Sequence, residues 1–135
     1  MLKLDGIQAG YNGMPVLFDI NVQINEGEMV AVLGANGAGK STILRVITGL
    51  LHPTAGAVKF REDPIHGLPP HEIVQREIVF VPQRRRIFGG LTVRENLELG
   101  AYTHRRDRQP SARTWRWSCT SFPNLRRGSA SSAEP

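Results

Sequence analysis

The sequence is poor in the features from which disulfide frameworks, secretion signals and membrane spans are built. It has one cysteine, Cys119, so no internal disulfide can form, and the thiol fits a reducing compartment. Residues 1–6 have no apolar run behind a basic start, as a secretion signal would require. No apolar stretch approaches the about 18 residues of a membrane-spanning helix. We therefore expect a single cytoplasmic domain without a secretory leader.

Acidic residues are scarce only at the end of the chain. In residues 1–101, ten lysines and arginines balance ten acidic residues, whereas residues 102–135 hold seven arginines and two acidic residues. This tail therefore carries the whole net charge of +5. A basic tail can bind nucleic acid or anionic lipid. Because residues 1–101 are neutral overall, nucleic-acid binding is the weakest functional class, and we expect no nucleic-acid partner.

One segment carries a specific chemical signal. Residues 34–41 read Gly-Ala-Asn-Gly-Ala-Gly-Lys-Ser and match the P-loop pattern G-x-x-x-x-G-K-S/T without deviation. Glycines let backbone N–H groups curl around phosphates, toward which a following helix points its positive end. The motif predicts a nucleoside triphosphate site in which Lys40 reaches the β- and γ-phosphates and Ser41 ligates Mg²⁺. The P-loop residues expected to contact the nucleotide are Gly34, Asn36, Gly37, Gly39, Lys40, Ser41 and Thr42.

The hydrophobic pattern around the P-loop predicts an α/β fold. Residues 2–7 and 20–25 alternate between apolar and polar, which is typical of antiparallel strands with one buried face. Residues 29–33 and 78–82 are continuous apolar runs, which we interpret as strands buried within a sheet. Residues 57–60 are expected to form a further short strand.

Three helices are predicted from their start signals and periodicity. The first runs from Ser41 to Leu50, directly after the P-loop. The second opens at Pro69-Pro70 and has Ile73 and Val74 on its apolar face. The third begins after Thr92, where Glu95 completes a capping box, and ends near Gly100.

Three separated features resemble the ATP-binding subunit of ABC transporters. Asn36 within the P-loop is typical of these proteins, and Tyr11 lies where the family places an aromatic side chain that stacks on adenine. A flat aromatic face binds a base with little demand for hydrogen bonds. Val81-Pro82-Gln83 is similar to the family's Q-loop, whose glutamine contacts Mg²⁺ or the attacking water. Taken alone, Tyr11 would be a strand-end tyrosine and Gln83 polar surface, but their order around the P-loop favours nucleotide binding.

The resemblance extends to importers of branched-chain amino acids, urea and related amides. It covers residues 1 to about 108 and includes residues 67–73, and residues 81–102 are its most specific part. It implies an ATP-binding subunit that couples ATP binding and hydrolysis to import, with ATP and Mg²⁺ as cofactors. The implied partners are membrane permease subunits, a second ATP-binding subunit and, indirectly, a periplasmic binding protein. Such a subunit lies in the cytoplasm against the inner face of the membrane.

Within this segment, the apolar residues Ile87, Phe88 and Leu91 are candidate contacts with the permease, although ordinary packing of a helical subdomain accounts for each equally well. Three other positions depart from the family pattern. Glu62, Glu77 and Arg84 stand where the family usually has glycine. Glycine at a turn often supplies a positive φ angle, which other side chains tolerate poorly. These substitutions indicate relaxed constraint.

Several later motifs of the family do not occur in residues 1–135. There is no Leu-Ser-Gly-Gly-Gln segment, no apolar strand ending in Asp-Glu, and no switch histidine after such a strand. Without a base or a water-positioning group, phosphoryl transfer loses the positioning on which it depends. We therefore assign no catalytic residue. The alternative function is a non-hydrolysing or non-functional fragment that at most binds nucleotide.

The expected organisation has two parts. Residues 1–101 form the N-terminal part of an ABC ATPase-like core whose C-terminal half is missing, so the P-loop strand should expose apolar surface. Residues 102–135 are rich in Arg, Ser and Pro and are expected to be disordered. A second hypothesis is that this tail is translated in a shifted frame, since residues 114–121 can be reread as Asp-Leu-Glu-Met-Val-Leu-His-Leu. The coding DNA tests this hypothesis.

Overall fold

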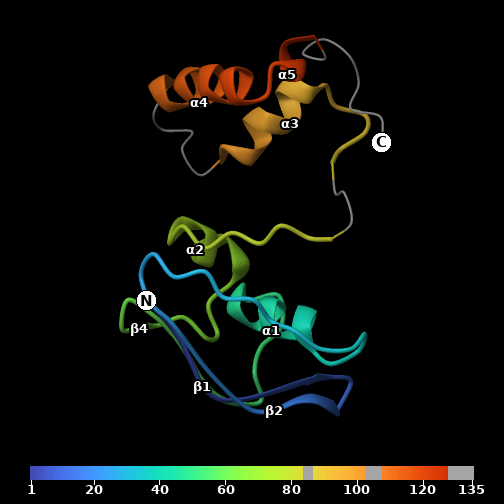
Figure 1. The fold of residues 1–135 in the computed structure, drawn as a ribbon, viewed down its shortest axis with the longest axis vertical. Helices are drawn as coiled ribbons and strands as arrows, with labels where there is room; N and C mark the ends of the chain where they lie inside the picture. The colour runs from blue at the N-terminus through green and yellow to red at the C-terminus, as the bar shows by residue number, and fades with distance from the viewer. Residues whose placement is uncertain (84–86, 103–107, 128–135) are drawn as a thin grey trace. The chain divides into compact units, whose positions relative to one another are not determined.

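The computed structural model describes residues 1–83, 87–102 and 108–127 and divides into two compact units (Figure 1). The first unit is Met1–Phe80 and the second is Val81–Pro135. The boundary at residue 101 that the composition indicated stays a prediction. In the described ranges, no helix is both long enough and apolar enough to cross a membrane.

A four-stranded antiparallel sheet organises the first unit. Its strands are β1 (Leu2–Tyr11), β2 (Met14–Ile24), β3 (Ala55–Phe60) and β4 (Asp63–Pro64), in the spatial order β2-β1-β3-β4. β1 pairs with both β2 and β3, so it is a central strand of the sheet. The predicted antiparallel strands near the N-terminus and the short strand before Arg61 are therefore confirmed.

The alternation expected through Ile7 is interrupted by a bulge in β1. Leu4 and Ile7 are both fully buried although Ile7 is the third residue after Leu4, so that strict alternation would place them on opposite faces. The register shifts between Leu4 and Ile7 against β2, and between Asp5 and Gln8 against β3. Gly6 adopts a φ of 59° at this point, and its N–H donates to Asn21 Oδ1 on β2 over 2.8 Å. A residue in the left-handed region often supplies the extra position of a bulge, and glycine does so at little cost. The bulge keeps the apolar residues of both halves of β1 on the core face.

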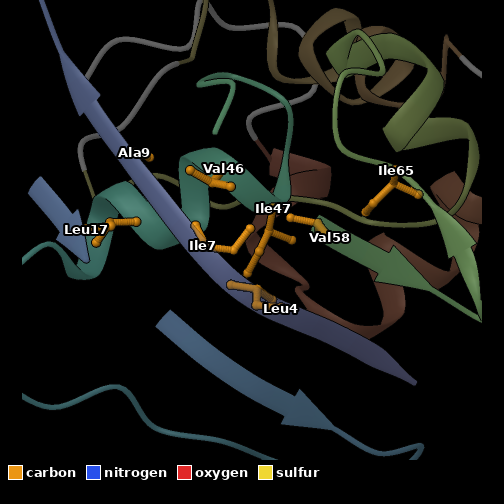
Figure 2. Packing of buried hydrophobic residues seen from close by; sticks show 8 residues of the cluster. All are labelled: Leu4, Ile7, Ala9, Leu17, Val46, Ile47, Val58 and Ile65. Carbon is orange, nitrogen blue, oxygen red and sulfur yellow. The ribbon is translucent and has the colours of Figure 1, made fainter. Parts of the chain in front are cut away.

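The core lies between the sheet and helix α1 (Lys40–Ile47). Ile47 of α1 lies beside Ile7 and Leu4 of β1 (Figure 2), and Val46 belongs to the same buried cluster. The remaining buried members of this cluster are Ala9, Leu17, Val58 and Ile65. Burying a side chain of this size contributes roughly 1.5–3 kcal/mol, so the contact with the sheet holds α1 and the loop before it.

Helix α2 (Pro70–Gln75) also packs in the first unit. Pro69 is its N-cap with an extended backbone, and Pro70 is its first residue, where a missing N–H costs nothing. Ile73 is 1% exposed, while Val74 is only partly buried. The predicted start and apolar face of this helix are confirmed.

The two apolar runs predicted as buried strands are not strands in the structure. Residues 29–33 and 78–82 have no strand assignment, and Met29 is 97% and Val81 85% exposed. A strand exists only where a neighbouring strand accepts its hydrogen bonds. Within the described residues, the sheet contains only β1 to β4, and none of them pairs with either run. The strand prediction was therefore wrong, whereas the expected exposure of apolar surface before the P-loop is confirmed.

In the part of the second unit that the structure describes, there are three α-helices: α3 (Val93–Gly100), α4 (Arg108–Ser121) and α5 (Asn124–Arg127). α3 has the predicted capping box, in which Thr92 Oγ1 accepts from the Glu95 N–H and the Glu95 carboxylate accepts from the Thr92 N–H. α4 and α5 differ from the expectation of a tail without regular structure. Ser118 and Cys119, in the last turn of α4, are buried. Burial of one face can stabilise a helix even where its sequence has only a weak hydrophobic periodicity.

Two of the residues that stand where the family usually has glycine lead to a prediction about stability. Glu62 has a φ of 70° and Glu77 a φ of 67°, so both occupy the left-handed region that glycine adopts freely, while Arg84 lies outside the described residues. Left-handed backbone costs other residues roughly 1–2 kcal/mol, of which the greater freedom of glycine in the unfolded chain offsets about half. We expect Glu62→Gly to raise the free energy of unfolding in urea by about 0.5–1 kcal/mol.

The control for this prediction is Glu26→Gly. Glu26 is exposed beside Gly27 and is not among the residues with positive φ. There, glycine only adds freedom to the unfolded chain, so the substitution should lower stability. Equal losses in the two variants would contradict the assigned strain at Glu62.

A second prediction concerns the capping box of α3. Hydrogen bonds from the Thr92 backbone N–H and then from its hydroxyl lower the pKa of Glu95 below its ordinary value of 4.5. The capping contribution is therefore fully present above the unfolded-state pKa and is lost as pH falls through the lower folded-state pKa. We expect Glu95→Gln to abolish this acid-dependent loss of helicity, measured by circular dichroism between neutral and acidic pH. Glu98→Gln removes a carboxylate from the same helix outside the cap and should leave the loss in place.

Candidate functional site

The P-loop has the backbone curvature that its glycines predict. Gly37 and Gly39 have φ angles of 88° and 86°, and the Ala38 N–H donates to Ala35 O over 3.2 Å across the turn. A Cβ on Gly37 would meet no atom within 4 Å. Glycine at this position is therefore required by its backbone conformation and not by lack of space.

Gly39 is constrained both by its conformation and by its surroundings. It is the left-handed residue immediately before α1, and an added Cβ would lie 2.7 Å from Leu17 Cδ2 on β2. The joint between the loop and the helix therefore rests directly on a core residue of the sheet. A side chain at position 39 would therefore require the buried Leu17 side chain or the first turn of α1 to shift.

The N-terminus of α1 is open to an anion. No side chain caps it, and its first turn contains no acidic residue. Thr42 is 6% exposed, whereas Ser41 has its side chain at the surface. The free N–H groups and the helix dipole together favour a negative group at this end. In the described residues, no cluster of three or more His, Cys, Asp or Glu could hold a metal ion.

Lys40 folds back over the loop that precedes it. Its Nζ donates to Gly34 O over 2.8 Å and to Ala35 O over 2.7 Å. These two carbonyls hold the ammonium group beside the curved backbone, where a phosphate would meet it. A phosphate is a stronger partner than a carbonyl, because both groups of that pair are charged.

Tyr11 ends β1 and lies against the second turn of α1. Its side chain is 37% exposed, and its hydroxyl oxygen accepts a hydrogen bond from Arg45 Nη1 over 3.0 Å. The neighbouring Thr42 hydroxyl lowers the pKa of Tyr11 most, and the hydrogen bond and charge of Arg45 lower it further, while partial burial opposes both. The ring therefore stands at the surface beside the helix that carries Lys40 and Ser41.

The structure thus brings together most of the predicted nucleotide contacts. The predicted P-loop residues lie in one loop and one helical turn, and Tyr11 joins them through Arg45. Asn36 is exposed in the loop. Gln83 is an exposed residue of the second unit, and its contact with Mg²⁺ stays a prediction.

Sequence reasoning did not identify Arg45 as part of this group. Its position offers one signal, since it lies four residues after Ser41 and therefore one helical turn further along the same face. The spacing alone would not have revealed the tyrosine hydroxyl that it contacts, because the two residues are 34 positions apart.

The sequence profile described as ABC transporter matches residues 17–128. The branched-chain amino acid transport ATP-binding protein BraG of Pseudomonas aeruginosa is 38% identical over 102 residues, which are 76% of this chain and 44% of BraG. The probable branched-chain amino acid transport ATP-binding protein LivF of Archaeoglobus fulgidus is 41% identical, with the same two shares. A cobalamin import ATP-binding protein of Halobacterium salinarum is 39% identical over 76% of this chain and 26% of its own. The chain therefore spans less than half the length of these relatives.

Solved structures of ABC ATP-binding proteins are also similar to this chain. The structure of an ATP-binding subunit of an ABC transporter is 29% identical and superposes with a TM-score of 0.84, over 98% of this chain and 54% of its own. A dimeric ATP-binding cassette in a post-hydrolysis state, bound to ADP and Pi, is 33% identical with a TM-score of 0.63. That match covers 73% of this chain and 46% of the cassette.

The position of Lys40 beside the P-loop backbone leads to a prediction about nucleotide binding. Because a charged hydrogen bond contributes roughly 1.5–3 kcal/mol, we expect Lys40→Ala to weaken binding of a nucleoside triphosphate by about 12- to 150-fold. Titration calorimetry with the 135-residue chain measures the dissociation constant. Lys3→Ala is the matched control, since Lys3 lies at the start of β1 and pairs with Asp5 over 3.5 Å. Equal losses in the two variants would show that the effect is only one of net charge.

Proposed function

This chain belongs to the ABC transporter family, and we propose that it is the ATP-gripping part of an ATP-binding subunit of an importer. Its first unit would hold the phosphates of ATP at the P-loop and the adenine at Tyr11. The proposal rests on one arrangement, in which α1 presents an open N-terminus and Lys40 in its first turn and contacts Tyr11 one turn later. An aromatic ring and an anion site on the same helix match the two ends of a nucleotide.

Magnesium is the second proposed cofactor. The Ser41 hydroxyl is exposed at the start of α1, on the same turn as Lys40. Mg²⁺ prefers oxygen ligands and is usually held in nucleotide sites by few protein groups together with substrate phosphates. We propose Ser41 as one ligand, and the resemblance of Val81-Pro82-Gln83 to the family's Q-loop supports Gln83 as a second. When bound, the ion would neutralise charge on the phosphates.

We further propose that the importer carries branched-chain amino acids or related amides. Residues 81–102 support this assignment, because they are the part that resembles such importers most specifically. Sequence identity over the whole matched region does not distinguish the transported substrates, since the cobalamin import protein is as similar to this chain as BraG is. The proposed partners are permease subunits, a second ATP-binding subunit and, indirectly, a periplasmic binding protein, at the cytoplasmic face of the membrane.

A second candidate function is nucleotide binding without hydrolysis. Phosphoryl transfer to water requires a group that orients or deprotonates the water. The first turn of α1 contains no acidic residue, and residues 1–135 contain no Asp-Glu pair after an apolar strand. This observation favours binding alone for the 135 residues tested in isolation.

The experiment measures ATP binding and phosphate release by the 135-residue chain with Mg²⁺, and compares ATP with inorganic tripolyphosphate. Because base stacking contributes roughly 1–3 kcal/mol, we expect Tyr11→Ala to weaken ATP binding by about 5- to 150-fold without affecting tripolyphosphate. The control is Tyr102→Ala, which alters the other tyrosine of the chain, in the second unit.

The outcomes separate the candidates. Phosphate release that Lys40→Ala abolishes supports the energy-coupling ATPase, and binding without release supports the second candidate. Absence of both binding and release would contradict the proposed function. Co-purification with branched-chain amino acid permease subunits tests the substrate class, and co-purification with permeases for other substrates only would overturn it.

A further inference from the structure

The contact between Arg45 and Tyr11 joins two segments that are far apart in the sequence. Arg45 lies in the second turn of α1 and Tyr11 is the last residue of β1. The hydrogen bond from Arg45 Nη1 to the hydroxyl is 3.0 Å long, and the guanidinium carbon lies 5.8 Å from the ring centroid. That distance is near the outer limit of about 6 Å for a cation–π contact, so the hydrogen bond is the principal interaction.

The helix dipole accounts for only part of the placement of Arg45. A basic residue near the C-terminus of a helix is favoured by the dipole, and Arg45 occupies such a place in α1. That role does not require a partner at the tyrosine hydroxyl. Among the described residues, no ion pair includes Arg45, and the Tyr11 hydroxyl is the side-chain acceptor assigned to it.

We propose that Arg45 is a positioning residue for nucleotide binding, which holds the Tyr11 ring in the orientation that receives the base. This inference rests on the proposed function, because it requires Tyr11 to stack on a base. A tyrosine that is 37% exposed has more than one accessible orientation, and ordering it on binding costs conformational entropy. The hydrogen bond orders the ring before the ligand arrives, so less of that cost falls on binding.

The arrangement also couples the two ends of the site. Lys40, Ser41 and Thr42 occupy the first turn of α1, and Arg45 lies about one turn, or roughly 5 Å, further along. The same rigid helix therefore carries the phosphate-binding groups and the group that orients the ring. A pyrophosphate or tripolyphosphate makes only the first set of contacts, whereas a nucleotide makes both.

The test compares Arg45→Ala, Tyr11→Phe and the double variant in their binding of ATP and of inorganic tripolyphosphate, measured by calorimetry on the 135-residue chain. Since one hydrogen bond contributes roughly 0.5–1.5 kcal/mol, each single variant should weaken ATP binding by about 2- to 12-fold and leave tripolyphosphate unchanged. The double variant should bind ATP no more weakly than the single variant with the larger loss, because both single substitutions remove the hydrogen bond between Arg45 and Tyr11. Arg45→Lys keeps a donor and a charge and should recover part of the affinity.

A spectroscopic readout separates positioning from general stabilisation. The chain has two tyrosines, so a Tyr102→Phe background leaves Tyr11 as the single tyrosine. Its titration, followed by NMR of ¹³Cζ-labelled tyrosine, should move toward the ordinary pKa of 10.0 in Arg45→Ala. Arg76→Ala, at an exposed arginine that follows α2, should change neither the titration nor the affinity.

The possible failures are distinguishable. If the unaltered chain does not bind ATP, the proposed function fails and the inference fails with it. If Tyr11→Ala weakens ATP binding while Arg45→Ala and Tyr11→Phe do not, only the positioning role of Arg45 is overturned. Equal losses for ATP and tripolyphosphate in Arg45→Ala, or additive losses in the double variant, would also overturn it. If Arg45→Ala does not fold, Tyr11→Phe and Arg45→Lys decide the question by the same criteria.

Discussion

The packing of α1 against the antiparallel sheet is the constraint on which the nucleotide site depends. Val46 and Ile47 anchor the helix to β1, and Gly39 brings the preceding loop onto Leu17 of β2. The loop itself is exposed, so few contacts of its own maintain its shape. Its curvature persists because the two elements around it are held by the core. The sheet therefore supports the phosphate site although none of its residues belongs to the P-loop.

The same packing explains why Tyr11, near the N-terminus, lies beside the helix that follows the P-loop. β1 runs beside α1 in the core, and its last residue emerges next to the second turn of the helix. The bulge at Gly6 contributes to this path, because without it the second half of β1 would turn its apolar residues away from α1. Tyr11 is thus positioned by backbone geometry, and its hydroxyl is then held by Arg45.

Two apolar segments of the chain behave differently from the core. Residues 29–33 and 78–82 have the composition of central strands, yet they carry exposed apolar side chains in the structure. Hydrophobic runs predict burial, but burial requires a surface to pack against and strand pairing requires a neighbour. Such surfaces favour association and aggregation. The 135-residue chain is therefore expected to be less soluble than its net charge suggests.

Local chemistry allowed much of the protein to be predicted from its sequence. The P-loop conformation, the start of α2 and the capping box of α3 follow from interactions within a few residues of one another. The left-handed backbone at Glu62 and Glu77 is indicated by the glycines that the family has at these positions. Strand identity at residues 29–33 could not be predicted in this way, because it depends on hydrogen bonds to another segment. The contact of Arg45 with Tyr11 likewise joins residues 34 positions apart. The sequence alone determined the nature of the phosphate site, whereas only the tertiary structure decided which side chain orients the ring beside it, since that pairing exists only when α1 packs on β1.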